Sequence, residues 1–145
     1  KRKTKVLVQA NLWDGDPDID AINRLTKRPL VKFSNIKPYT TNKITVFNSQ
    51  NTLIDRSILK YYSVLPFVGR MDDIWGCYYL QDKIDRGSII FDKPTVYQDR
   101  NEQDLVTNLE NEIIGYRNTL NLINKKYEFE DRTKDFIKIY TKSFS

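Results

Sequence analysis

Residues 5–21 read KVLVQANLWDGDPDIDA, and this stretch decides the fold class. The opening run KVLVQAN is rich in Val and Leu, which is typical of a buried strand. The sequence then turns polar, and Asp16 followed by Pro17 predicts a helix N-cap and the first helical position. Asp18 and Asp20 suit the first helical turn, where the helix dipole favours negative charge. We therefore expect a buried strand that leads through a turn directly into a short helix.

Strands and helices continue to alternate along the chain, which is the pattern of an α/β fold. After the first strand we expect a short helix up to about residue 24, a strand over 43–47, a short helix over 55–62, a helix from residue 70 to near residue 87, strand pieces over 88–91 and 95–98, and helices over 101–125 and 131–142. The apolar stripe predicted for the long helix comprises Leu105, Leu109, Ile113, Tyr116, Leu120 and Ile123.

The composition excludes several classes of chemistry. The chain has 145 residues, no His and a single Cys, Cys77. Relays that use His, zinc sites with His ligands, internal disulfides and CxxC pairs are therefore impossible within it. Any general acid or general base in this chain must therefore be a carboxylate, a Lys or a Tyr. The lone cysteine fits a reducing compartment, so we expect a cytoplasmic protein.

The basic charge belongs to one end of the chain. Lys1, Arg2, Lys3 and Lys5 supply four of the five net positive charges, so the other 140 residues carry +1. The folded part thus lacks the basic face that a nucleic-acid binder needs. No run approaches 18 apolar residues, so we expect no membrane span. Because the first residue is not Met, we expect a piece of a longer or processed protein.

The segment WDGDPDID, residues 13–20, places four carboxylates within seven residues, directly after a buried strand. Ligands of open α/β sheets bind at the carboxyl ends of strands. Alternating acids there can ligate a hard cation or accept hydrogen bonds from sugar hydroxyls. A well-capped helix start explains Asp16, Pro17 and Asp18 equally well, but it explains Trp13 and Asp14 less well.

The segment GRMDDIW, residues 69–75, places two adjacent carboxylates at the start of a helix. An ionised Asp72 or Asp73 at the mouth of a cleft can accept a proton from a sugar hydroxyl as a general base. Arg70 can neutralise phosphate, and Trp75 offers a face on which a sugar ring can pack. Physical reasoning alone favours the structural alternative, in which Asp72 caps the helix and Trp75 belongs to the core.

Two further polar segments follow predicted strands. The amides of FNSQNT, residues 47–52 and including Asn48, can hold the hydroxyls of a ligand or satisfy a turn. The segment 97–101 is also polar, although a simple role for Asp99 or Asn101 as the cap of the long helix would explain it without a ligand.

The order of these segments resembles the second half of a nucleotide-sugar glycosyltransferase of the GT-A fold. It is most similar to the reversibly glycosylated polypeptide and UDP-arabinopyranose mutase family. That family's GLW…PDYDA compares with NLW…PDIDA over residues 11–21, and its GRYDDMW compares with GRMDDIW over residues 69–75. The resemblance covers about residues 5–101. It implies the acceptor-side half of a GT-A-like mixed sheet over 1–100, followed by C-terminal helices over 101–145.

The resemblance implies transfer of a sugar from a nucleotide-sugar donor to an acceptor hydroxyl. It makes Asp73 the general base and Asp72 the residue that orients the acceptor. Arg70 would neutralise the diphosphate and Trp75 would pack on a sugar. The implied lining of the sugar or acceptor pocket comprises Trp13, Asp14, Asp16, Asp18 and Asn48. A divalent cation, Mn²⁺ or Mg²⁺, is also implied, with ligands that lie on a missing N-terminal half.

Three alternatives remain open at this point. The chain can be a non-catalytic carbohydrate- or protein-binding module derived from such a transferase. A nucleotide-sugar mutase would share the same motifs. A nucleic-acid binder that uses the tail 1–5 is a further possibility, and it predicts a salt dependence of about four charges or fewer.

Overall fold

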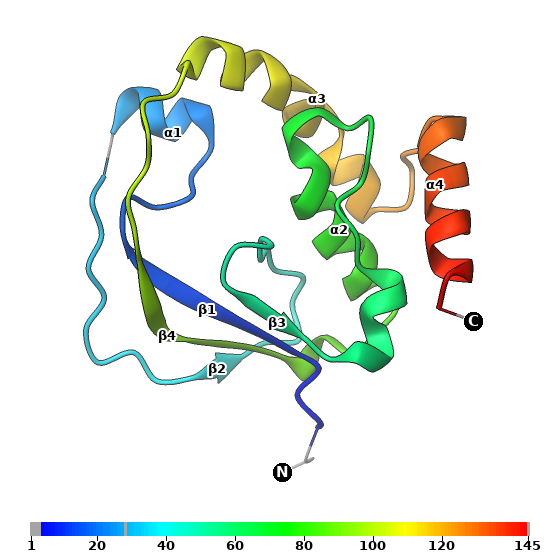
Figure 1. Ribbon diagram of the computed structural model, residues 1–145, viewed down its shortest axis with the longest axis horizontal. Coiled ribbons are helices and arrows are strands. Elements are labelled where there is room, and N and C mark those ends of the chain that lie inside the picture. Colours follow the sequence, from blue (N-terminus) through cyan, green and yellow to red (C-terminus); the bar gives the residue numbers. More distant parts are fainter. Residues whose placement is uncertain (1–3, 28, 145) are drawn as a thin grey trace.

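A mixed four-stranded sheet forms one side of the protein in a computed structural model, which describes residues 4–27 and 29–144 (Figure 1). The strand order is β2-β4-β1-β3. The two central strands, β1 (Val8–Gly15) and β4 (Ile89–Gln98), run parallel. The short edge strands, β2 (Tyr39–Thr40) and β3 (Thr52–Ile54), pair with them in antiparallel fashion. The α/β class expected from the sequence is confirmed at this level.

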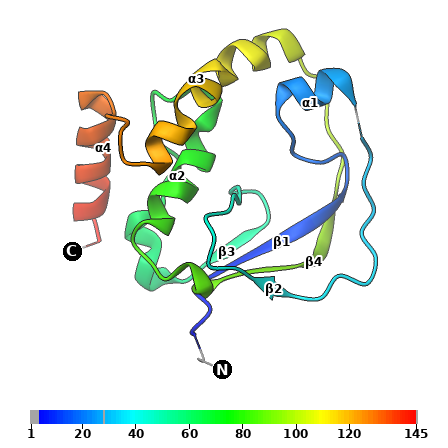
Figure 2. The ribbon, with the colours of Figure 1, turned by 180° about the vertical axis from the view of Figure 1, so that it is seen from behind.

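The helices lie at one end and on one side of the sheet. The helix α1 (Ala21–Thr26) lies beyond the carboxyl end of β1, and α2 (Asp72–Gln81) packs nearer the sheet than the C-terminal helix (Figures 1 and 2). The long helix α3 (Leu105–Ile123) runs from α1 to α2, and α4 (Asp131–Lys142) lies on the outer side. The short 3-10 helices are η1 (Arg56–Tyr61), η2 (Gly69–Met71) and η3 (Arg86–Ser88).

Two apolar clusters hold these elements together. One joins the sheet to α2 and contains Val8, Leu80 and Ile89, all of which are fully or almost fully buried. The other surrounds Trp75 and receives side chains from α3, from the segment that follows it and from α4. The C-terminal helices are therefore part of the same packed body as the sheet.

The first strand is longer than the sequence predicts. It continues to Gly15 because Trp13, Asp14 and Gly15 pair with β4 instead of forming a turn. The predicted N-cap at Asp16 is therefore wrong. The N-cap is Asp20, whose carboxylate accepts a hydrogen bond from the Asn23 N–H. Both aspartates suit a cap locally, and the pairing with β4 decides between them.

The predicted strand over 43–47 is also wrong, because its backbone bonds to side chains rather than to a strand. The Thr45 N–H donates to Gln81 Oε1 at 3.1 Å, and the Phe47 N–H donates to Cys77 Sγ at 3.3 Å. Both acceptors lie on α2. Strand pairing begins only later, at β3, where Thr52 pairs with Ala10.

The predicted helices differ from the observed ones mainly at their ends. The helix predicted to continue to near residue 87 ends at Gln81, and the long helix begins at Leu105 behind an Asp104 cap instead of near residue 101. The predicted strand pieces over 88–91 and 95–98 form one strand, β4. The range predicted for α4 is confirmed.

The inward face of the long helix was also predicted incorrectly. Its buried residues are Glu112 and Gly115, whereas Leu120 of the expected apolar stripe is 73% exposed. The cause is the close packing of η2 against α3: a Cβ atom on Gly115 would collide with the side chain of Met71.

Candidate functional site

A cleft of about 780 Å³ opens at the carboxyl ends of β1 and β4, between α2 and α3. Segments that are far apart in sequence meet there: the loop after β1, the 46–50 loop, the start of α2, Arg100 after β4, and one face of α3. Its polar and charged lining comprises Asp18, Asp20, Ser49, Gln50, Arg70, Asp72, Asp73, Arg100, Glu112, Tyr116 and Thr119.

Asp18 fastens three of these segments to one another. Its Oδ2 accepts a hydrogen bond from Asn48 Nδ2 at 2.8 Å, and its Oδ1 lies 2.6 Å from Arg100 Nη2. Asn48 is buried, and the Arg100 side chain is only 11% exposed. Asp18 and Asn48 were both predicted as site residues, and the structure brings them into direct contact.

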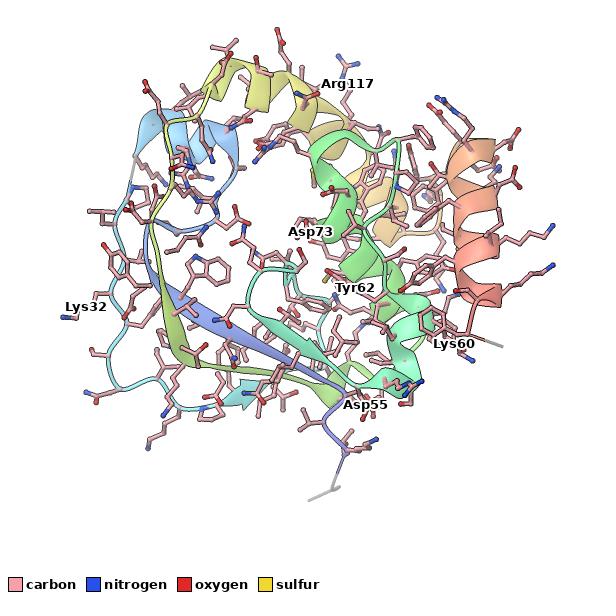
Figure 3. The ribbon with its side chains drawn as sticks, viewed as in Figure 1. Lys32, Asp55, Lys60, Tyr62, Asp73 and Arg117 are labelled. Atoms are coloured by element: carbon pink, nitrogen blue, oxygen red, sulfur yellow. The ribbon has the colours of Figure 1, made fainter. Side chains whose placement is uncertain are left out.

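Asp73 is held at the start of α2 by the 46–50 loop. Its Oδ2 accepts hydrogen bonds from the Ser49 N–H at 2.8 Å and from the Ser49 hydroxyl at 3.0 Å. Both bonds end on one oxygen, so Oδ1 is the atom available to a ligand. Asp73 extends from α2 toward the sheet side (Figure 3). The neighbouring Asp72 also lines the cleft, and both carboxylates lie in the first turn, where the helix dipole stabilises negative charge.

A buried carboxylate joins α1, α3 and η2 on the opposite wall. Glu112 Oε2 accepts hydrogen bonds from the Ala21 N–H at 2.8 Å and from the Tyr116 hydroxyl at 2.9 Å. Its Oε1 lies 3.4 Å from Arg70 Nε. The positive charge of Arg70 is therefore already matched by a carboxylate of the protein, which leaves less of it for the phosphate role that the resemblance implies.

The Tyr116 hydroxyl also lies 3.1 Å from Asp20 Oδ1, so the two carboxylates share its single proton. Burial, together with these two carboxylate acceptors, raises the pKa of Tyr116 above its usual range, so this hydroxyl stays protonated and acts as a donor. Burial alone would raise the pKa of Asp20, but hydrogen bonds from Asn23 and Tyr116 outweigh it and hold that pKa below its ordinary value. Asp20 is therefore ionised at neutral pH.

Trp75 cannot serve as the sugar platform that the resemblance implies. Its side chain is 0% exposed, and its indole N–H donates to Thr119 Oγ1 at 3.0 Å. Tyr127 and Phe129 contact its ring edge-on. The structural alternative, in which Trp75 belongs to the core, is the correct one.

Asn48 is not itself part of the cleft lining, which it contacts through Asp18, and three other predicted residues also lie outside the cleft. Asp16 pairs with Arg24 at 2.6 Å, and Asp14 accepts a hydrogen bond from the Phe33 N–H at 2.8 Å. Both carboxylates thus have structural partners on neighbouring segments. Trp13 lines a separate, smaller hollow beside Gln50.

The cleft also contains Glu112 and Tyr116 of α3, which the sequence reasoning did not predict as site residues. Ser49, Gln50 and Arg100 also line it, and they belong to the polar segments 47–52 and 97–101 without having been named individually. One signal pointed to Glu112. A glycine inside a long helix, here Gly115, commonly marks a close approach to another element, and Glu112 lies three residues earlier on the same helix face. Arg100 lies in the polar segment 97–101, but its pairing depends on where the fold places Asp18.

Within residues 4–27 and 29–144, no three acidic or thiol side chains gather in a way that could hold a metal ion. No helix of this part of the chain is long and apolar enough to cross a membrane. The basic tail residues 1–3 lie outside the described residues. The chain matches no model of a known protein family, and no curated protein matches it significantly.

Proposed function

We propose that this chain supplies the acceptor side of a nucleotide-sugar-dependent glycosyltransferase of GT-A-like fold. The observation that carries the proposal is the convergence of the three motif segments. Asp18 from PDIDA, Asn48 from FNSQNT and Asp73 from GRMDDIW are distant in sequence, yet Asp18 and Asn48 bond directly and Asp18 and Asp73 line one cleft. The resemblance places acceptor recognition in these same segments.

Asp73 is the general base of this proposal. Its Oδ1 would accept the proton of an acceptor hydroxyl as that oxygen attacks the anomeric carbon of the donor, and the bond from that carbon to the nucleoside diphosphate would break. Ser49 holds the carboxylate in place through Oδ2. In a reaction that retains configuration, Asp73 would instead bind an acceptor hydroxyl.

The remaining cleft residues would position the acceptor. Asp72 and the Ser49 hydroxyl lie beside Asp73 and offer polar contacts to neighbouring hydroxyls. The Asp18–Arg100 pair and the Glu112–Arg70 pair both line the cleft and help to fix its shape. The implied divalent cation would be bound by residues outside this chain and would counter the charge of the leaving diphosphate, so no ligand for it is assigned here.

The test replaces Asp73 by Asn in the whole protein and measures sugar transfer from a panel of nucleotide sugars. Asn keeps the shape of Asp and removes its basicity, so we expect a loss of transfer of about 10²–10⁴-fold with donor binding unchanged. Asp135→Asn, an exposed change on α4, is the matched control and should transfer at the parent rate. An unchanged transfer rate in Asp73→Asn with intact donor binding would refute the catalytic assignment.

A non-catalytic saccharide-binding module is the second candidate, and one observation favours it. Asp18, Asp73 and Glu112 each bond to a residue from another segment, which gives the cleft a fixed shape without any ligand. Such a module would bind saccharide and would neither transfer sugar nor hydrolyse the donor. The nucleotide-sugar panel therefore separates the two candidates.

A further inference from the structure

A second hollow of about 230 Å³ adjoins the main cleft at the end of the sheet. Gln50 contributes to the lining of both spaces, so the two are neighbours on the molecule. Its lining comprises Trp13, Gln50, Asn51, Val96, Tyr97, Gln98 and Asp99.

The register of the two central strands builds this hollow. Trp13 pairs with Val96 and Gly15 pairs with Gln98, after an irregularity between Asn11 and Trp13. Such irregularities turn side chains away from the regular alternation of a strand. They place Trp13 of β1 beside the end of β4, where Gln98 of β4 and the amides Gln50 and Asn51 line the same hollow.

Tyr97 presents an aromatic face that the backbone holds in place. Gly15 has a φ of 97°, and a Cβ atom there would meet the ring of Tyr97 as well as the Gln98 carbonyl. The ring therefore lies directly against the Gly15 backbone while the side chain remains 72% exposed. An aromatic ring supported on one side and open on the other is suited to packing against the apolar face of a flat ligand.

The indole N–H of Trp13 is buried and has no hydrogen-bond partner among the residues that the structure describes. Buried polar groups are almost always bonded, and a tryptophan N–H can only donate. An acceptor oxygen is thus expected beside it. This orphaned donor is independent of the aromatic packing and points to an oxygen-bearing ligand.

The charges of both spaces favour a neutral ligand. Five carboxylates and two guanidinium groups line the cleft, a formal surplus of three negative charges, and both guanidinium groups are paired with carboxylates. The lining of the hollow contains Asp99 and no basic residue. A nucleic acid needs Lys or Arg to neutralise its phosphates, so aromatic stacking of bases is disfavoured here.

We propose that the Trp13–Tyr97 hollow is a second sugar subsite, and that the ligand is a neutral oligosaccharide spanning the cleft and the hollow. This inference rests on the proposed function, because it takes the cleft to be a saccharide site. One sugar unit would lie against Asp73 and the next units would pass Gln50 and pack on Tyr97. A hydroxyl of the oligosaccharide would accept the hydrogen bond of Trp13.

The test measures the binding of neutral gluco-, manno-, galacto-, xylo- and arabino-oligosaccharides of increasing length by calorimetry. We expect affinity to rise once the ligand is long enough to leave the cleft. Trp13→Ala and Tyr97→Ala should each weaken the longer ligands about tenfold and leave the single sugar unchanged. Because Tyr97 is exposed, its variant keeps the fold even if Trp13→Ala does not. Tyr39→Ala, an aromatic change at the other end of the sheet, is the control.

The outcomes separate the two proposals. Binding of single sugars without any gain from length, or an equal effect of the variants on short and long ligands, would overturn the second subsite and leave the proposed function standing. Tighter binding of phosphorylated sugars or of single-stranded DNA than of neutral oligosaccharides would also overturn it. The absence of any saccharide binding would overturn both.

Discussion

Removal of the Glu112 carboxylate is the sharpest structural test of how the cleft is built. Glu112→Ala leaves the N–H of Ala21, a residue that is 2% exposed, without its acceptor, which costs about 1–3 kcal/mol. The Tyr116 hydroxyl can still donate to Asp20, so the loss of its bond to Glu112 adds no more than about 1 kcal/mol. The Arg70 side chain is 42% exposed, so its ion pair adds no more than about 0.5 kcal/mol.

We therefore expect Glu112→Ala to lower the free energy of unfolding by about 3 kcal/mol, which corresponds to a fall in Tm of about 10 °C for a domain of this size. The assay is urea unfolding followed by tryptophan fluorescence, since Trp75 reports on the core that joins α2 and α3. Glu110→Ala is the matched control, because Glu110 is exposed on the same helix and its change should be nearly neutral.

Hydrogen exchange provides the readout that a general loss of helix stability would not reproduce. In Glu112→Ala, which removes the acceptor, the Ala21 amide should exchange faster, whereas it should be unaffected in Glu110→Ala. The reasoning is refuted if Glu112→Ala and Glu110→Ala unfold within about 0.5 kcal/mol of each other, because surface changes alone span that range.

Three further predictions concern the packing of the fold and the ionisation states of two buried or paired groups. Gly76→Ala should lower Tm despite the better helix propensity of Ala, because its Cβ would collide with the Ser63 carbonyl, while Gly87→Ala should be tolerated. Burial raises the pKa of Cys77 to about 12, so the native thiol should react with a thiol reagent at pH 8 only as fast as the protein unfolds. A hydrogen bond from Lys125 holds the pKa of Asp82 below its ordinary value of 3.8. The ionised Asp82 therefore stabilises the fold above that pH, and this stabilisation is lost as the pH falls below it. Asp82→Asn should accordingly flatten the acid limb of a curve of unfolding free energy against pH.

The sequence predicted one part of the cleft for the right reason, because Asp18 follows β1 and lines the cleft at the carboxyl end of that strand. Asp73 and the 46–50 loop also line the cleft, but neither of them follows a strand. The sequence also predicted the range of α4, where charged and apolar residues alternate with helical spacing.

What the sequence could not predict depends on contacts between distant segments. The 43–47 run has strand-like composition, yet its backbone N–H groups donate hydrogen bonds to the side chains of Gln81 and Cys77 on α2. No feature of the local sequence predicts these bonds. Trp75 illustrates the same limit for the site: a tryptophan after two aspartates suits either a platform or a core, and only the packing of Tyr127 and Phe129 around it decides.

The pairing of charges within the cleft bears directly on what it can bind. Arg100 and Arg70 are each paired with a carboxylate, Asp18 and Glu112, so part of the positive charge that an anionic ligand would meet is already neutralised. A neutral hydroxyl can instead donate to the free lone pairs of a carboxylate oxygen such as Asp73 Oδ1, which needs no rearrangement to accept a hydrogen bond. Because the network already fixes these carboxylates, a ligand that fits them loses little free energy to reorganisation. The same pairing that stabilises the cleft therefore favours a neutral saccharide over a phosphate-bearing molecule.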